Sequence, residues 1–574
     1  MKTIWDILEP DPAAVRQLAS EMAIDPVVAA VLVNRHITTA KAAGAFLKPT
    51  LAAITPPDTI TDMPAAARRL ARALREGEKI LVFGDYDVDG VTATALLLDF
   101  LRQAGGRVAH YIPHRRKEGY GLKSDHVRQR ILPGGFRLVV TVDCGISSHE
   151  AVHSAAAGGV DVIITDHHRP SGSLPEALAV INPQRSDCSA GLDHMAGVGM
   201  AFYLLVELRR QLRSEGFWHK RPEPNLKAFC DLVALGTIAD MVPLVAENRA
   251  FIRAGLPVMT SRPGLKALTD ICRIAPDRVE SDDVAFRLAP RLNAAGRMAH
   301  ANLALRLLTT RDPQRSRRIA RTLDRLNTRR QHTENAIVEM IRARIAARPE
   351  LLEHRALVMA QPAWHEGVLG IVAARMARTY CRPVVLLSRN GRMACGSARS
   401  IPGVDLHRAL SACRDHLAHF GGHAMAAGLT LPVDQLPSFE ERLQDYLAHE
   451  TLAEAYRPRL ALDAEIGLDQ IRPLLLDQLE ALQPFGQAIP EPIFMLRDIG
   501  VDTHRLVGGH HRRLTLSAPR AGRVQAIHFN VDPAQSPPER FDRMACHVRW
   551  NRWKESRRPQ LVIVATDPET GMRR

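Results

Sequence analysis

Carboxylate and imidazole side chains gather in four short segments of this sequence, each placed where an apolar run ends. DYDVDG follows the run ILVFG, VDCG follows RLVVTV, and DHH follows DVIIT. A fourth segment, GTIADMVPL, follows the apolar helical stretch AFCDLVAL. Together these segments supply Asp85, Asp87, Asp89, Asp143, Asp166, His167, His168 and Asp240.

Clustered carboxylates repel one another unless cations neutralise them. Oxygen ligands joined by one or two imidazoles suit Mn²⁺ or Mg²⁺ better than metals that prefer thiolates. Two such ions about 3.5–4 Å apart can activate water and hold both oxygens of an in-line phosphoryl displacement. The set therefore predicts a phosphoester hydrolase with two Mn²⁺ or Mg²⁺ ions.

Each segment alone also has a purely structural interpretation. An Asp after a strand is often a helix N-cap, and Asp89 fits that role. DCG alone is a turn, and DHH alone can cap a loop with one imidazole exposed. Four segments in order, three of them at strand ends, favour a shared site over four unrelated turns.

The elements that must position these residues are those of a parallel sheet. From about residue 66 the pattern alternates amphipathic helices with short apolar strands, which is typical of a parallel sheet covered by helices on both faces. Ligands of such sheets bind outside the carboxyl ends of the strands. Three predicted strands end there in Asp or His, so we expect the acidic segments to meet at that edge.

The order DxDxDG, DCG, DHH and a later ADxVPL-like segment resembles the DHH phosphoesterase superfamily. Five further segments are similar to its RecJ family: APRLNAAGRM (289–298), WHEGVLGIVAARMA (364–377), SARS (397–400), FGGHAMAAG (420–428) and PFGQAIPEPIF (484–494). The last departs from the usual FGxGNPEP at Ala488 and Ile489, within a linker rather than the metal site. The resemblance covers roughly residues 20 to 570.

The resemblance implies a set of site residues. It makes Asp143 the bridge between two ions, His168 either a ligand or a phosphate contact, and Asp85 a group that orients a ligand or water. The implied metal ligands are Asp87, Asp89, Asp143, His167 and Asp240. The implied catalytic groups are Asp85, His168, His423 and Arg399. The implied substrate contacts are Ser397, Arg399, Gly421, Gly422 and His423, with Asn293 and Arg297 on the connector. For Arg297, a salt bridge is an equally good interpretation.

The resemblance also implies an activity: 5′-to-3′ hydrolysis of single-stranded DNA to 5′-mononucleotides, in DNA repair and recombination. It implies a monomer, with a single-strand-binding protein or a helicase as possible partners; neither spacing nor composition indicates the polarity. One alternative is a hydrolase of nano-RNA or small phosphoesters, but such chains are shorter and lack a barrel extension. Another is a non-catalytic DNA-binding scaffold of the same fold, which predicts eroded acids, whereas every acid is present here.

The expected fold class is α/β: a two-lobed DHH core, a DHH-associated α/β domain and a C-terminal OB-like β-barrel, the last predicted from short alternating strands. A run of aromatic and basic residues from Arg549 to Arg557, with Trp550, Trp553, Arg552 and Lys554, is either a stacking patch for DNA or barrel core. The expected domains are a helical segment (1–65), the DHH catalytic domain (66–310), a long connector helix (311–352), the DHH-associated domain (353–455) and the OB-like domain (456–574).

Composition indicates which partners and which cellular compartment to expect. The net charge of +14, from 76 basic and 62 acidic residues, indicates a polyanionic partner, or else a genome that favours Arg over Lys. The eight cysteines are scattered without a CxxC pair, which argues against a zinc ribbon or a disulfide framework. No apolar run approaches the roughly 20 residues of a membrane span, so we expect a cytoplasmic enzyme.

Overall fold

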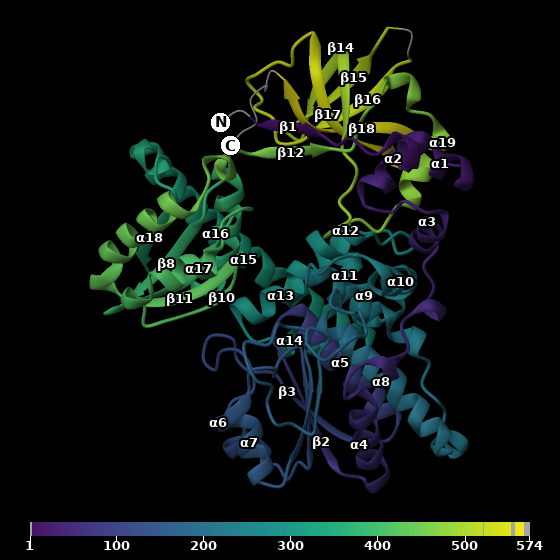
Figure 1. Ribbon diagram of the computed structural model, residues 1–574, viewed down its shortest axis with the longest axis vertical. Helices are drawn as coiled ribbons and strands as arrows, with labels where there is room; N and C mark the ends of the chain where they lie inside the picture. The colour runs from purple at the N-terminus through teal and green to yellow at the C-terminus, as the bar shows by residue number, and fades with distance from the viewer. Residues whose placement is uncertain (1–2, 520–521, 553–556, 568–574) are drawn as a thin grey trace. The chain divides into compact units, whose positions relative to one another are not determined.

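The computed structural model describes residues 3–519, 522–552 and 557–567, which form two compact units (Figure 1). The acid-bearing unit comprises Asp11–Asn327 and Asp477–Glu491. The C-terminal unit comprises Met1–Pro10, Thr328–Leu476 and Pro492–Arg574. Each unit has its own sheets.

A five-stranded parallel sheet organises the acid-bearing unit, in the order β3-β2-β4-β5-β6. Gly84, Val142 and Thr165, the last residues of β2, β4 and β5, lie in one row across the sheet. The three predicted strands therefore end level at one edge, as the sequence pattern predicts. The strands are β2 (Lys79–Gly84), β3 (Arg107–Tyr111), β4 (Leu138–Val142), β5 (Asp161–Thr165) and β6 (Ala179–Ile181).

Helices cover both faces of this sheet, because its strands are apolar on both sides. Ile80 and Val82 pack into one buried cluster, and Leu81 and Phe83, which alternate with them, pack into another. The first cluster includes residues of α4 (Met63–Glu76), α5 (Val88–Gln103), α8 (Gly197–Ser214) and α9 (Cys230–Ala239). The second includes residues of η3 (Val127–Ile131) and α7 (His149–Ala157). The expected α/β layering is confirmed.

The expectation of a helical segment over residues 1–65 is wrong at its start. Ile4–Ile7 form β1, a strand paired in parallel with β12 (Arg459–Leu462). Four residues of IWDI carry too little periodicity to indicate a strand, and the partner lies about 450 positions away. The helices expected after it are present as α1 (Pro12–Met22), α2 (Pro26–Asn34) and α3 (Ala40–Leu47).

Further helices complete the acid-bearing unit: α10 (Ala246–Gly255), α11 (Pro263–Cys272), α13 (Ala289–Met298) and α14 (Asn302–Thr309). The predicted connector is one helix, α15 (Pro313–Ala347), and the boundary between the two units falls within it.

A late segment of the chain, Asp477–Glu491, belongs to the acid-bearing unit and is fastened there by Arg249 of α10. The guanidinium is 1% exposed, stacks on the ring of Phe46 and donates to the carbonyls of Phe46, Leu482, Gln483 and Pro484. These carbonyls take the place of a counter-ion for the buried charge.

The C-terminal unit contains a five-stranded sheet in the order β10-β11-β9-β8-β7, in which only β7 and β8 are parallel. Its strands are β7 (Leu357–Pro362), β8 (Val384–Asn390), β9 (Met393–Arg399), β10 (His419–His423) and β11 (Ala426–Pro432). The accompanying helices are α16 (Glu366–Tyr380), α17 (Leu406–Ala412) and α18 (Leu436–Glu450).

The same unit ends in a closed barrel. Strand β14 (Phe494–Val507) pairs with both β15 (His511–Ser517) and β17 (Arg540–Asn551), and the ring is completed through β16 (Val524–His528) and β18 (Arg558–Asp567). This confirms the OB-like barrel.

In the proposed aromatic patch of this barrel, the Arg557 guanidinium lies 4.3 Å from the centre of the Trp550 ring. Trp553 and Lys554 lie outside the described residues. Among the helices that the structure describes, none combines the length and apolarity needed to cross a membrane.

Candidate metal centre

Seven predicted residues converge at the carboxyl edge of the parallel sheet. They form three sets whose ligand atoms lie within 4.8 Å of one another. Asp143 belongs to two sets and His167 to two, so the sets merge into one cluster. The sets are Asp85, Asp87 and Asp143; Asp89, His167 and Asp240; and Asp143, His167 and His168.

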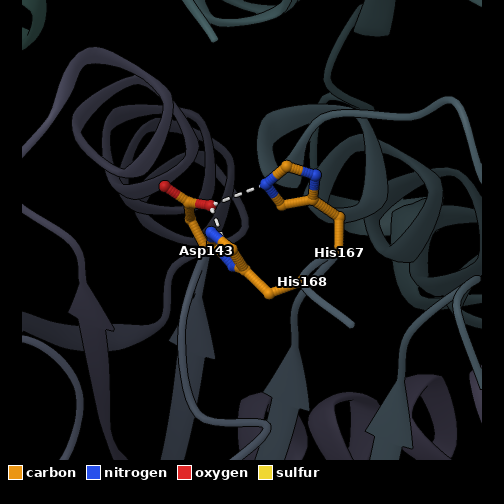
Figure 2. Close-up of side chains that lie close together, drawn as sticks. All are labelled: Asp143, His167 and His168. Atoms are coloured by element: carbon orange, nitrogen blue, oxygen red, sulfur yellow. Dashed lines mark ion pairs between the residues drawn. The ribbon is translucent and has the colours of Figure 1, made fainter. Parts of the chain in front are cut away.

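His167 lies at the centre of the cluster. Its Nε2 is 3.2 Å from Oδ1 of Asp143 (Figure 2), 3.6 Å from Oδ2 of Asp240 and 3.9 Å from Oδ2 of Asp89. Burial and the neighbouring His168 lower the pKa of His167 to about 4. The imidazole is therefore neutral at pH 7, which is the form that binds a metal.

Asp143 follows the end of β4 with a φ of 59°, a left-handed conformation that is uncommon for a residue with a side chain. Strained residues of this kind concentrate at functional sites. Its backbone N–H donates to the carbonyl of Thr165 at 2.9 Å, and its own carbonyl accepts from the Tyr120 hydroxyl at 3.0 Å. These bonds hold the carboxylate beside His167.

Asp89 lies in the first turn of α5 and is 1% exposed. Its carboxylate accepts from the backbone N–H groups of Gly197 and Val198, the first two residues of α8, at 2.6 and 2.9 Å. The N-cap of α5 is Asp87, whose side chain accepts from the N–H of Gly90 at 3.1 Å. The capping role considered for Asp89 is thus taken by Asp87.

His168 is oriented by two partners. Its Nδ1 lies 2.7 Å from Oδ1 of Asp166 and 3.2 Å from the hydroxyl of Tyr120. Burial alone would lower the pKa of His168, but the Asp166 carboxylate raises it to about 9. Asp166 itself is fully buried and also accepts from the backbone N–H groups of Ile146, His167 and His168.

The electrostatics of the cluster call for a cation. Burial and mutual repulsion raise the pKa values of Asp85, Asp143 and Asp240 well above normal, and raise that of Asp89 to about 7. Oδ1 of Asp85, Oδ1 of Asp143 and Nε2 of His167 are buried without a hydrogen-bond partner. Buried polar atoms of this kind are rare unless something binds them. Hard oxygen donors with one neutral imidazole fit a divalent cation of the Mn²⁺ or Mg²⁺ type.

Two arginines lie near Tyr86, the residue that follows Asp85. The Arg115 guanidinium is 4.7 Å from the centre of the Tyr86 ring, and the charge of Arg115 opposes the rise in the pKa of Asp85. Arg297 acts electrostatically on the same tyrosine. Its helix α13 approaches closely, because a Cβ added to Gly296 would meet the carbonyl oxygen of Tyr86 at 2.7 Å. Asn293 precedes Arg297 by one helical turn.

The C-terminal unit aligns four of the five remaining predicted residues on one sheet face; the fifth, Gly422, alternates with them and pairs with Ala427. Ser397 and Gly421 both pair with Gly428, and Arg399 and His423 both pair with Ala426. Residues two apart on a strand share a face, so Ser397, Arg399, Gly421 and His423 lie on the same side. The N-terminal part of α16 packs against Ser397 and Arg399, since a Cβ on Gly370 would meet the Arg399 guanidinium at 2.8 Å.

Sequence reasoning missed Arg115, Tyr120 and the orienting role of Asp166. The first two lie in the loop after β3, a fourth strand that ends at the same edge. The basic and aromatic run HRRKEGYG at that strand end is the signal that would have found them. Asp166 was visible in DHH, but its hydrogen bonds depend on the turn after β5.

Comparison with known proteins extends over nearly the whole chain. Three family models match: the DHH family, N-terminal domain (residues 79–237), the DHHA1 domain (353–449) and the RecJ OB domain (462–565).

Curated relatives named single-stranded-DNA-specific exonuclease RecJ include one from Dickeya dadantii, 38% identical over 87% of this chain and 89% of the relative. Another, from Escherichia coli, is 36% identical over 88% and 90%. The solved structure of RecJ from Thermus thermophilus in complex with Mn²⁺ covers 98% of this chain and is itself covered to 79%, with a TM-score of 0.82 and 30% identity. This chain belongs to the RecJ family of the DHH phosphoesterases.

Proposed function

We propose that this chain is a metal-dependent exonuclease that hydrolyses single-stranded DNA. The observation that carries the proposal is the merged cluster of Asp and His side chains, in which three buried ligand atoms have no hydrogen-bond partner. Its relatives are named single-stranded-DNA-specific exonucleases, and solved relatives contain Mn²⁺ or Mg²⁺.

The residue sets support two ions. Asp85, Asp87 and Asp143 would hold one, and Asp89, Asp143, His167 and Asp240 would hold the other. Asp143 would bridge them, in keeping with its place in two of the three sets. When bound, the ions would activate water and neutralise charge on the phosphoryl group.

The side chains around the ions would bind the phosphate and position the metal ligands. His168, oriented by Asp166, would contact the scissile phosphate. Arg297, with Asn293 one turn away, would bind phosphate on the same unit. Asp85 is buried, and a Cβ on Gly90 in the first turn of α5 would lie 2.7 Å from the Cα and Cβ of Asp85. This close packing of Asp85 would also help to fix the position of that turn.

The C-terminal unit would contribute the remaining substrate contacts. Ser397, Arg399, Gly421, Gly422 and His423 share one sheet or its edge and include a guanidinium and an imidazole, which suit a phosphate oxygen. The barrel would bind the strand further from the scissile bond, as OB-folds do.

We further propose 5′-to-3′ polarity, release of 5′-mononucleotides and action in DNA repair and recombination, on the strength of family membership alone. The same argument supports a cytoplasmic monomer that works with a single-strand-binding protein or a helicase. The domain limits 1–65, 66–310, 311–352, 353–455 and 456–574 also stay proposals.

One experiment tests the central proposal. Single-stranded oligonucleotides labelled at the 5′ or the 3′ end are incubated with the protein and Mn²⁺ or Mg²⁺, with EDTA as the metal-free control. We expect immediate release of labelled mononucleotide from the 5′-labelled strand, and none in EDTA. Hydrolysis of duplex DNA at the same rate, or of dinucleotides alone, would contradict the proposal.

A further inference from the structure

Two helices of the acid-bearing unit each bring one carboxylate to the metal centre. Asp89 lies in the first turn of α5, and Asp240 is the C-cap of α9. The two carboxylates share a ligand set with His167, so the start of α5 lies beside the end of α9. The distance between them depends on how far one helix is shifted along the other.

A buried arginine joins the same two helices at their other ends. Arg262 donates from Nε and Nη2 to both oxygens of Asp231 in α9, at 2.6 and 3.2 Å. Its Nη1 donates to Oδ2 of Asp99 in α5 at 2.8 Å. Asp99 and Asp231 are ten and nine positions from Asp89 and Asp240, so this contact is about 14 Å from the metal ligands along each helix.

The contact has little freedom. Arg262, Asp99 and Asp231 are at most 6% exposed, and Nη1 of Arg262 also donates to the carbonyl of Leu308 at 2.9 Å. Guanidinium and carboxylate meet in a planar fork that fixes their orientation as well as their distance. Arg311 adds a second cation at Oδ2 of Asp99, at 3.1 Å.

Between the two ends, α9 packs against side chains of α5 at Gly236, where α9 has no side chain of its own. A Cβ on Gly236 of α9 would lie 2.4 Å from Oγ1 of Thr92 and 2.9 Å from Oδ1 of Asp89. A small shift of α9 along α5 would therefore move Asp240 relative to Asp89 and also disturb the Asp89 carboxylate.

We propose that Arg262 is a positioning residue for the metal centre: by joining Asp99 to Asp231, it fixes α9 against α5 and so sets the separation of the Asp89 and Asp240 carboxylates. The inference rests on the proposed metal-dependent function. Arg262 does not touch the ligands, and its effect reaches them only through the two helices.

The simpler alternative is that this buried network only contributes to the stability of the fold. A matched control distinguishes the two. Arg185 is also largely buried and binds two carboxylates, Asp62 and Asp187, at 2.7 and 2.6 Å. None of these three residues lies on α5 or α9.

The experiment compares Arg262→Lys with Arg185→Lys in the full chain. Lysine keeps the charge but loses the fork. Mn²⁺ binding is measured by calorimetry without DNA, at a temperature well below both melting points, and thermal stability is measured in EDTA. We expect both variants to melt earlier, but only Arg262→Lys to bind Mn²⁺ more weakly, by about tenfold or more, as for groups that orient metal ligands.

If Arg262→Lys does not fold, Asp99→Asn replaces it in the experiment. This change keeps the shape of the side chain and leaves Arg262 paired with Asp231. It should also weaken Mn²⁺ binding. Wild-type affinity for Mn²⁺ in the Arg262 or Asp99 variant would overturn the inference, as would equal weakening in Arg185→Lys. Failure of the wild-type protein itself to bind Mn²⁺ would instead contradict the proposed function.

Discussion

At the scale of single residues, we expect the proposed metal centre to depend most on Asp143. It is the one carboxylate shared by two ligand sets, and it reaches them through a strained backbone. We expect Asp143→Ala to retain less than about a hundredth of wild-type turnover, because losing a shared ligand should cost several kcal/mol in the transition state. Binding of single-stranded DNA, measured by fluorescence anisotropy, should survive.

The matched control for this prediction is Asp125→Ala, which removes an exposed carboxylate that forms an ion pair with Arg128. It should leave turnover unchanged. Turnover by Asp143→Ala above a few per cent of wild type would mean that Asp143 does not bridge two ions.

His423 tests the contribution of the other unit. Its imidazole is exposed on β10, in the same row as Arg399. If it donates to a phosphoryl oxygen that gains charge, His423→Ala should lower single-turnover rates by about a hundredfold, while bound metal stays constant. A lower melting temperature with normal chemistry would mean instead that the imidazole only packs, and loss of metal would make it a ligand.

At the scale of the strand, the two neighbouring glycines of β10 differ in whether a side chain would fit. A Cβ on Gly422, which has a φ of 145°, would lie 2.3 Å from the carbonyl oxygen of Ala426, whereas a Cβ on Gly421 would meet nothing within 4 Å. Gly422→Ala should therefore destabilise the protein by about 2 kcal/mol or more, and Gly421→Ala by less than about 1 kcal/mol.

Substitution of Gly421 also tests whether this residue contacts substrate. If substrate approaches the backbone at Gly421, Gly421→Ala should raise KM although the protein melts normally. Normal KM in a normally folded Gly421→Ala would remove this residue from the substrate contacts.

A loop anchored to α10 supplies a pH-dependent test. Burial opposes ionisation of Glu247, but hydrogen bonds from His194 (2.9 Å) and Thr55 (2.8 Å) lower the pKa of Glu247 to about 2, from an ordinary 4.5. A carboxyl with a depressed pKa stabilises the fold above its unfolded pKa and loses this contribution as pH falls. The shift corresponds to about 3 kcal/mol.

Glu247→Gln should therefore unfold more easily than wild type at pH 7 in urea, and the difference should shrink between pH 4.5 and about 2. A difference that stays constant over this range would mean that Glu247 contributes through packing rather than through its charge.

The elements also show how far sequence reasoning extends. The strands that end in DYDVDG, VDCG and DHH were predictable, because buried parallel strands are continuous apolar runs and their carboxyl ends share an edge. Arg115 and Tyr120 were not, since their loop is shaped by contacts of Glu118 with Tyr111 and the backbone of His114, which no periodicity encodes. The strand β1 was missed because its partner lies at the far end of the chain.

At the scale of the whole molecule, the acid-bearing unit is completed by a segment encoded after the DHHA1 domain. Three of the four carbonyls that accept from Arg249 come from residues 482–484. A chain cut at residue 455 leaves this guanidinium buried without most of its acceptors, at about 1–3 kcal/mol for each unmet group. A chain cut at residue 491 keeps them.

We therefore expect the chain ending at 491 to melt several degrees above the chain ending at 455. Both truncated chains should bind single-stranded DNA more weakly than the full protein, and their binding should depend less on salt. Arg249→Met should destabilise the longer chain but stabilise the shorter one. Equal melting of the two truncated chains, or the same sign of the Arg249→Met effect in both, would remove the 477–491 segment from the fold of this unit.

Because β1 pairs with β12, the two strands of this pair are synthesised at widely separated times. Ile4–Ile7 leave the ribosome before their partners Arg459–Leu462, which are added about 450 residues later. At 5–20 residues per second, this strand waits on the order of 20–90 s without its neighbour. An unpaired apolar strand is open to wrong partners for that whole interval. Shortness and charged side chains both limit such pairing. β1 has both features, with four residues and the carboxylate of Asp6.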